Sequence, residues 1–328
     1  MSNIAERVRE IRKIWGGFQS ARVLLTANNY RVFDYLIKPQ SAKNISSKLK
    51  ADLRAAEILL DALTGMGLLK KHTGRYKNSS LTAQFLVAGR PYYQGDIIKH
   101  ADTLWQNWSG LDHVLKTGEP YHKAHNHEAF IFGMHNLAVL KAENIIDRVG
   151  LKGVKTALDL GGGPGTYAME MAKRGVKVTL FDRPETVKIA KKVINNPSLI
   201  LSLNKGRTGG VKFIQGDFIH DDIGKGYDLI FISQILHSMS ETDNISVLKK
   251  CKKALNADGR IVIQEFNISN DRTQPQPSAL FSINMLVNTE GGRCYSSDEL
   301  KHWLGKIGFK KIKKQIVEDC VIVSANDF

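Results

Sequence analysis

A glycine-rich turn between an apolar strand pattern and a helical pattern constrains this chain most strongly. The run Ala157–Leu160 is compact and mostly apolar, the turn Gly161–Gly165 follows it, and we expect a helix to begin near Thr166. Glycines allow positive φ angles and a close approach of the backbone to a ligand. A helix start adds unpaired N–H groups. The turn therefore predicts a site for a nucleotide or nucleoside.

The C-terminal half alternates strand patterns with helical stretches, which is typical of a parallel sheet covered on both faces. The last two strand candidates are joined by a tight connection and must be antiparallel to each other. We therefore expect an α/β fold whose mostly parallel sheet ends in an antiparallel C-terminal hairpin. The strand candidates are 156–160, 176–181, 211–215, 228–233, 260–266, 309–316 and 319–324.

The N-terminal region has helical apolar spacing instead. One helical segment is expected to include residues 23–36, Ser41 is a candidate N-cap for a short helix, and Asp52 is a candidate N-cap for the next. That helix should stop at Gly65, and a small hairpin should turn at residues 73–74. Helix, short helix, helix and hairpin in this order describe a winged-helix module over residues 1–90.

Composition narrows the class of protein further. The chain has 328 residues, 42% of them hydrophobic, which excludes global disorder. No run approaches the roughly 18 apolar residues of a membrane span, and the amino terminus lacks the apolar stretch of a signal peptide, so we expect no membrane insertion and a cytoplasmic location. The cysteines Cys251, Cys294 and Cys320 form no CxxC pair, so neither disulfides nor a thiolate zinc site is indicated.

Residues 91–150 are predicted to be a helical linker. Five histidines lie there, from His113 to His135, but the stretch has no HExxH spacing and few carboxylates, so a polar loop followed by a helix is favoured over a metal site. The net charge of +15 is scattered through the chain. Its densest part, the lysines between Lys310 and Lys314, is interpreted as the solvated side of an edge hairpin.

Acidic residues after the glycine turn indicate which nucleoside it would bind. Asp182 ends the second strand candidate, 17 residues after Gly165, where an acid is expected to accept both ribose hydroxyls. Asp217 and Phe218 end the third and suit an exocyclic amine and an adenine face. Asp159 would repel a pyrophosphate but attract a cationic aminoacyl group, which favours S-adenosylmethionine over NAD. No Gly-Lys-Ser/Thr follows the glycines, so a P-loop is excluded.

The DxGGGxG loop, Asp182, the Gly216–Phe218 triplet and the winged-helix start together resemble the small-molecule O-methyltransferases related to caffeate, acetylserotonin and hydroxyneurosporene methyltransferases. The resemblance covers nearly the whole chain. It implies a Rossmann-like class I methyltransferase domain over residues 151–328, a winged-helix dimerisation domain and hence a homodimer, and S-adenosylmethionine as cofactor. The expected cofactor-binding residues are Asp159, Gly161, Gly162, Gly163, Gly165, Asp182, Arg183, Asp217, Phe218 and Ser233.

The same resemblance identifies a reaction centre. In that family a histidine after the fourth strand is the general base, and the matching residue is His237. Glu265 matches the acid that orients the base, because a carboxylate that accepts the imidazole N–H fixes its tautomer. The family's second flanking acid falls on Cys294, and Met239 replaces a tryptophan. These departures leave open a base assisted by Glu265 alone, or an acceptor that needs little help from a base.

The expected acceptor is a small aromatic or enolic molecule. An alternative is carbon methylation of an activated ring, such as a quinone or tetrapyrrole, achieved mainly by proximity. The candidate acceptor residues are Met134, His135, Phe281, Asn284, Met285 and Cys294.

A rival from another class is a winged-helix DNA-binding regulator with a ligand-sensing domain. Its recognition helix, residues 52–66, would carry Arg54 as its one basic residue beside three acids, which is a poor phosphate surface. We therefore expect no nucleic-acid partner. A nicotinamide oxidoreductase is disfavoured by Asp159 and by the antiparallel final hairpin.

Overall fold

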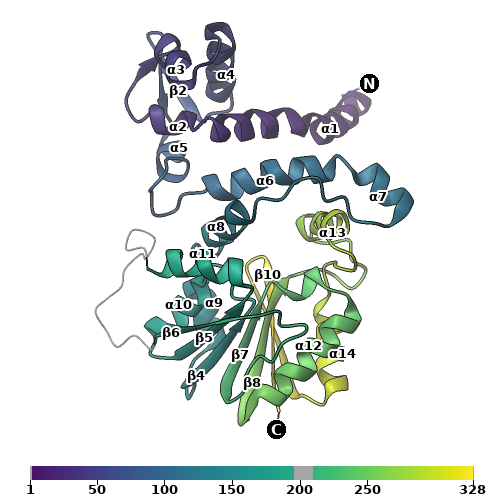
Figure 1. Cartoon of the computed structure of the whole chain (residues 1–328). Helices are drawn as coiled ribbons and strands as arrows, with labels where there is room; N and C mark the ends of the chain where they lie inside the picture. Colours follow the sequence, from purple (N-terminus) through teal and green to yellow (C-terminus); the bar gives the residue numbers. More distant parts are fainter. Residues whose placement is uncertain (1, 196–209, 328) are drawn as a thin grey trace. The chain divides into compact units, whose positions relative to one another are not determined.

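The computed structural model describes residues 2–195 and 210–327, and divides the chain into two compact units, Met1–Asp102 and Thr103–Phe328. Figure 1 shows the elements of each unit. Among the described residues, no helix is both long and apolar enough to span a membrane.

The first unit is mainly helical, with a small sheet in the strand order β1-β3-β2. Ser41 caps α3 by accepting from the Asn44 N–H at 3.2 Å, and Asp52 caps α4 by accepting from the Ala55 N–H at 2.8 Å, as predicted. Its elements are α1 (Ser2–Asn29), α2 (Val32–Tyr35), β1 (Gln40–Ser41), α3 (Ala42–Leu49), α4 (Leu53–Gly65), β2 (Leu69–His72), β3 (Arg75–Asn78), α5 (Ser80–Phe85) and α6 (Gly95–Trp108), which ends beyond the unit boundary.

The expected single helical segment over residues 23–36 is wrong. Arg31 takes a left-handed backbone conformation with φ 53° and separates α1 from α2. The break turns the chain so that Ala27, before it, and Phe33, after it, are both buried in the same core. The apolar spacing continues through the break, so periodicity alone gave no signal for it.

The second unit is a seven-stranded sheet in the order β6-β5-β4-β7-β8-β10-β9, in which β6 to β8 are parallel and β10 is antiparallel to both β8 and β9. This confirms the predicted sheet and its final hairpin. The strands are β4 (Thr156–Leu160), β5 (Lys177–Asp182), β6 (Val211–Gln215), β7 (Tyr227–Ser233), β8 (Leu255–Phe266), β9 (Lys310–Val317) and β10 (Cys320–Asn326).

Helices cover both faces of this sheet (Figure 1). One face buries Ile145, Met171 and Val187 from α9, α10 and α11, and the other buries Leu248 and Trp303 from α12 and α14. The helices are α7 (Leu111–Thr117), α8 (His127–Ala138), α9 (Ala142–Val149), α10 (Thr166–Lys173), α11 (Pro184–Ile194), α12 (Glu241–Ala254), α13 (Gln276–Asn288) and α14 (Ser297–Ile307), with a short 3-10 turn at Leu236–Ser238.

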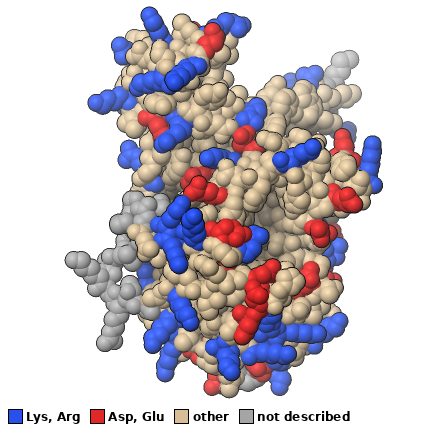
Figure 2. All heavy atoms as spheres, viewed as in Figure 1, with Lys and Arg blue, Asp and Glu red and all other residues tan. Residues whose placement is uncertain are grey.

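Basic side chains are spread over the molecular face in Figure 2 and interspersed with acidic ones. The lysine-rich strand β9 is an edge of the sheet, and its lysines are exposed. This agrees with the interpretation of that stretch as a solvated edge. Lysines on an edge strand also oppose pairing with another chain.

Candidate functional site

The glycine turn joins the carboxyl end of β4 to α10. Gly161, Gly163 and Gly165 have φ values of +66°, +52° and +79°, which side chains rarely allow. A Cβ on Gly161 would lie 2.6 Å from the Ile235 Cδ1 atom, whereas a Cβ on Gly163 would meet nothing within 4 Å. No side chain caps α10. The turn therefore packs closely against the protein at Gly161 and is open at Gly163.

Asp159 is the most unusual acid at this end of the sheet. Its residue exposure is 1%, and its Oδ2 atom has no hydrogen-bond partner among the described residues. Burial, with a smaller contribution from the charge of Asp182, raises the pKa of Asp159 to about 7. An unpartnered buried carboxylate oxygen is costly unless a donor or a cation reaches it.

Asp182, at the end of β5, is tied to the glycine turn. Its Oδ2 accepts from the Gly163 N–H at 2.8 Å and its Oδ1 from the Arg183 N–H at 2.7 Å. Burial raises the pKa of this carboxyl, while the two backbone donors oppose that shift. The Arg183 side chain is 59% exposed and pairs with Glu185 at 3.5 Å, so the Arg183 contact with Asp182 is made by its backbone.

The ends of β6 and β7 bring the remaining candidate cofactor residues to the same edge of the sheet. The Phe218 Cε1 atom lies 3.5 Å from where a Cβ on Gly161 would stand. Asp217 Oδ1 accepts from the Ile219 N–H at 2.8 Å. The Ser233 hydroxyl donates to Gln264 Oε1 at 2.9 Å. Gln264 is fully buried and was not predicted, since its partner lies 31 residues earlier in the chain.

His237 and Glu265 form a buried pair. His237 lies in the 3-10 turn after β7, Glu265 lies in β8, and the distance from His237 Nδ1 to Glu265 Oε2 is 2.7 Å. The other carboxylate oxygen, Oε1, accepts from the Leu236 N–H at 2.8 Å. Asn244 Nδ2 donates to the Leu236 carbonyl at 2.9 Å and so supports the same turn. An ionised Glu265 accepts a hydrogen bond from the N–H at Nδ1. In the neutral imidazole this arrangement leaves Nε2 as an acceptor.

Two phenylalanine rings lie beside the imidazole of His237. Phe281 meets the His237 ring edge to face with centroids 4.9 Å apart, and Phe266 lies 4.2 Å from Phe281. Phe281 belongs to α13, which also carries Asn284 and the buried Met285. His237 and Phe281 were predicted from separate stretches of the sequence, and the structure brings them together with Phe266, which was not among the predicted site residues.

Asn284 is hydrogen-bonded by a residue of α6 that the sequence did not indicate as its partner. Its Oδ1 atom accepts from Trp108 Nε1 at 2.9 Å and from Asn288 Nδ2 at 3.1 Å. No local sequence pattern links Trp108 to a partner 176 residues away. Nδ2 of Asn284 is not used in any contact among the described residues.

Cys294 is buried, and its N–H donates to Ser282 Oγ at 3.2 Å. Burial raises the pKa of the Cys294 thiol to about 11, with the carboxylate of Glu265 adding to the rise. The thiol is therefore neutral at physiological pH. Residue 294 therefore places no negative charge beside Glu265.

His135 lies beside the glycine turn. Its Nδ1 atom is 2.9 Å from the Thr166 hydroxyl at the start of α10, and burial lowers the pKa of His135 to about 4. Met134 precedes it on α8 and is half-buried. Both residues were expected at the acceptor, and among the described residues neither makes a hydrogen bond to His237, nor does His135 stack on Phe281.

Histidines of α7 and α8 make contacts within the protein. His113 packs against Tyr121 with ring centroids 5.7 Å apart, and His127 Nε2 lies 3.1 Å from the Thr186 hydroxyl. Within residues 2–195 and 210–327, no group of three or more histidine, cysteine or acidic side chains is placed to hold a metal ion. The stretch is a polar loop followed by α8, as the sequence predicted.

Comparisons with known proteins identify the family of this chain. The O-methyltransferase domain family matches residues 94–310, and the O-methyltransferase dimerisation domain matches residues 13–88. The chain therefore belongs to the O-methyltransferase family. It is an S-adenosylmethionine-dependent methyltransferase that acts on small molecules.

Similar proteins align with nearly the whole chain. The 3-hydroxy-5-methyl-1-naphthoate 3-O-methyltransferase of Streptomyces sahachiroi is 29% identical over 312 residues, covering 90% of this chain and 88% of its own. The acetylserotonin O-methyltransferase of Gallus gallus is 27% identical and covers 90% of both chains. The crystal structure of human N-acetylserotonin methyltransferase in complex with S-adenosylmethionine is 23% identical, with a TM-score of 0.86 over 98% of this chain and 97% of that one.

Proposed function

We propose that the protein transfers a methyl group to a hydroxyl of a small aromatic or enolic molecule, with His237 as the general base. The observation that carries this proposal is the buried pair of His237 and Glu265 at the carboxyl end of β7, joined at 2.7 Å. In open α/β sheets this edge is where ligands bind. The pair holds an imidazole with one nitrogen oriented and the other available to accept a proton.

The residues around the glycine turn fit the cofactor. The unpartnered Asp159 oxygen suits the cationic ammonium of the aminoacyl group, and the turn is open at Gly163. Asp182 keeps further lone pairs for the ribose hydroxyls, and the Phe218 ring beside Gly161 suits an adenine face. Gly162, Gly165, Asp217 and Ser233 complete the proposed cofactor site, and the Arg183 backbone shapes it.

When bound, S-adenosylmethionine would supply an electrophilic methyl group whose leaving group is a neutral thioether that keeps the electron pair of the carbon–sulfur bond. His237 Nε2 would take the proton of the acceptor hydroxyl as the acceptor oxygen becomes methylated. Glu265 accepts from Nδ1–H and stabilises the imidazolium that forms. Alignment of oxygen and methyl contributes on the order of 7–11 kcal/mol to lowering the barrier.

An aromatic acceptor is supported by the rings beside His237. Phe281 and Phe266 offer flat apolar surfaces, Met285 adds a polarisable one, and the unused Asn284 Nδ2 can donate to a ring substituent. The name of the Streptomyces relative specifies a hydroxyl on a naphthoate ring. Carbon methylation by proximity alone is the alternative, and it predicts that loss of the His237 imidazole leaves turnover intact.

The test begins with binding. Calorimetric titration with S-adenosylmethionine and S-adenosylhomocysteine should give micromolar affinity, and NAD should not bind. A panel of phenols, naphthols and enols is then incubated with methyl-labelled cofactor, and the methylated atom is identified by NMR of the product. Failure of every hydroxyl acceptor combined with methylation of ring carbon would overturn the proposed acceptor chemistry.

The homodimer is supported by the family match over residues 13–88 and by an exposed apolar face on α1. Ile11, Ile14, Trp15 and Phe18 lie at helical spacing and are 52–78% exposed. Light scattering should give about twice the chain mass of 36.6 kDa. Ile14→Asp should shift the mass toward the monomer, whereas Ser20→Asp on the same helix should not.

The absence of a nucleic-acid partner remains a prediction. Residues 13–88 match a dimerisation domain of methyltransferases, which supports a role in assembly. The regulator hypothesis predicts salt-dependent binding to random duplex DNA at low ionic strength. We expect no such binding at micromolar protein, and a salt-dependent complex would reinstate that hypothesis. The cytoplasmic location likewise stays a prediction.

A further inference from the structure

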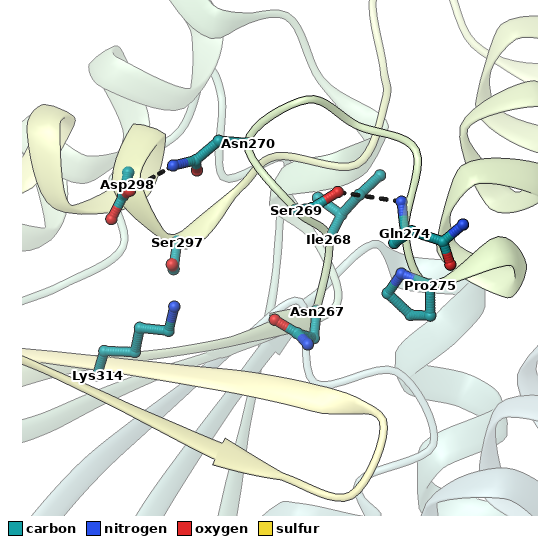
Figure 3. A pocket seen from close by; sticks show the side chains of 9 residues that line it. All are labelled: Asn267, Ile268, Ser269, Asn270, Gln274, Pro275, Ser297, Asp298 and Lys314. Atoms are coloured by element: carbon teal, nitrogen blue, oxygen red, sulfur yellow. Dashed lines mark hydrogen bonds between the residues drawn. The ribbon is translucent and has the colours of Figure 1, made fainter.

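A polar pocket of about 530 Å³ lies outside the residues assigned above to cofactor and acceptor (Figure 3). Three parts of the second unit line it: the segment Asn267–Pro275 that follows β8, the first turn of α14 with Ser297 and Asp298, and Lys314 of β9. The same segment leads into α13. The pocket is large enough for a small metabolite.

The walls of the pocket are fixed by hydrogen bonds within the protein. The Ser269 N–H donates to the Gln274 carbonyl at 2.7 Å, and the Gln274 N–H donates to Ser269 Oγ at 3.0 Å, so the segment closes on itself. Asn270 Nδ2 donates to Asp298 Oδ2 at 2.7 Å and ties the segment to α14. Figure 3 shows both connections. The pocket is therefore shaped before any ligand enters.

Two charged side chains of opposite sign line the pocket, Asp298 and Lys314, and they differ in how they are paired. Both oxygens of Asp298 are engaged, Oδ1 by the Lys301 ammonium at 2.5 Å and Oδ2 by Asn270. Hydrogen bonds from Lys301 and Asn270 lower the pKa of Asp298, and the charge of Lys314 adds to this. Lys314 itself has no ion pair within 4 Å among the described residues. Its ammonium therefore makes no direct ion pair, although it is close enough to Asp298 for the two charges to interact.

Ser297 adds a hydrogen-bond donor to the pocket that Lys314 lines. Ser297 is 4% exposed and lines the pocket, yet its hydroxyl has no hydrogen-bond partner in the described part of the chain. In Figure 3 this oxygen and the Lys314 ammonium face the same space. The capping box of α14 uses Ser296 and Glu299 and leaves the first-turn N–H groups of Ser297 and Asp298 for another acceptor. The Ser297 hydroxyl makes no hydrogen bond within the described chain and is therefore available to a ligand in the pocket.

We propose that this pocket binds a small molecule bearing an oxyanion, a carboxylate or a phosphate. Lys314 pairs with the negative charge, and the Ser297 hydroxyl and the α14 N–H groups donate to its oxygens. The half-buried Asn267 amide, which has no partner among the described residues, serves a neighbouring hydroxyl. The ligand would thereby bridge β9, α14 and the segment that leads into α13.

The experiment is a calorimetric titration of the full chain with inorganic phosphate and, separately, with citrate at constant ionic strength. Saturating S-adenosylhomocysteine is present so that the cofactor site does not compete. Lys314→Gln should weaken binding by about tenfold or more. Lys313→Gln removes the same charge from the next residue, which does not line the pocket and points to the other face of β9, and should leave affinity unchanged.

Ser297→Ala provides a second, uncharged test and should also weaken binding while the melting temperature stays close to that of the wild type. Binding of phosphate but not citrate, or the reverse, identifies which oxyanion the pocket selects. Equal losses in Lys314→Gln and Lys313→Gln would show general attraction to a basic strand and overturn the proposal. The absence of saturable binding by both probes would overturn it as well.

Discussion

The cofactor end and the reaction centre satisfy their polar groups in opposite ways. At the cofactor end, a fully buried oxygen of Asp159 has no partner in the described chain, and the glycine turn is open at Gly163. At the reaction centre, both oxygens of Glu265 are used, one by His237 Nδ1 and one by the Leu236 N–H. The first region is left incomplete for a ligand, whereas the second is organised in advance.

This difference implies that the cofactor end determines affinity and the reaction centre determines turnover. A charge left unpaired in the protein is a source of binding energy for a cation, so changes at Asp159 should appear in cofactor affinity. A pair that is already assembled adds little to affinity but saves reorganisation during the reaction, so changes at His237 and Glu265 should appear in kcat.

The largest effect is expected for His237→Ala, which removes the proposed base. Turnover should fall by something like 10²–10⁴, with cofactor affinity nearly unchanged, because the imidazole acts on the acceptor proton. His220→Ala, an exposed histidine, is the matched control. Full activity in His237→Ala would contradict base catalysis and favour methylation by proximity.

A smaller loss is expected for Glu265→Gln, about 10²-fold in kcat. A hydrogen bond to a charged group is worth roughly 1.5–3 kcal/mol, and the amide that replaces the carboxylate cannot accept at both of its ends. The Leu236 N–H or the His237 Nδ1–H then loses its acceptor. Steady-state kinetics measure the loss. A change confined to the KM for cofactor would contradict the assignment of Glu265 to turnover rather than to cofactor affinity.

Asp159→Asn should weaken S-adenosylmethionine binding by about tenfold, the equivalent of roughly 1.4 kcal/mol, and leave kcat at saturation nearly unchanged. The wild-type affinity should also depend on pH. The pKa of Asp159 is raised to about 7, and a cationic ligand prefers the ionised carboxylate, so affinity should rise up to tenfold per pH unit below about 7 and level off above it. The Asn variant should not show this slope.

Stability of the unliganded protein should follow the opposite sign. The folded-state pKa of Asp159 lies above its ordinary value, so the folded state holds the proton more tightly than the unfolded chain. The corresponding stability is present below about pH 4 and is lost as the pH rises through about 7. Thermal unfolding should therefore show Asp159→Asn gaining stability relative to the wild type between these values. No relative change across this window would contradict the burial of an unpaired carboxyl.

The fold was predictable where periodicity and turn residues act locally. The bounds of β4 and β6 were predicted to the residue, because short apolar runs lie between turn signals there. β8 begins at Leu255, earlier than the expected residue 260, since polar residues and Gly259 at its start resemble a turn. The break at Arg31 was missed because apolar spacing continues across it.

Candidate site residues could be predicted where they belong to a local sequence motif. They could not be predicted where their role depends on a hydrogen-bond partner far away in the sequence. The glycine turn, Asp182, His237 and Glu265 belong to recognisable patterns. Gln264, Asn244 and Trp108 support these patterns through contacts that no local spacing encodes. His135 contacts Thr166 at the start of α10, 31 residues later in the chain, and sequence alone assigned it to the acceptor.

The smallest effect is expected at Cys294. Burial raises the pKa of this thiol to about 11, so at physiological pH it adds no charge beside Glu265. Cys294→Ala should change kcat by less than about threefold, and the small cavity should cost on the order of 1 kcal/mol of unfolding free energy, measured by denaturant titration. Cys294→Ser is the matched control for volume.

A loss of kcat beyond about tenfold in Cys294→Ala, with folding retained, would mean that the thiol takes part in the reaction. The centre would then no longer rest on Glu265 alone, and its organisation in advance of the ligand would be incomplete. Near-wild-type turnover would instead mean that a single carboxylate, bonded to both His237 and the Leu236 N–H, is sufficient to orient the imidazole. The contrast with the unpaired Asp159 would then hold in full.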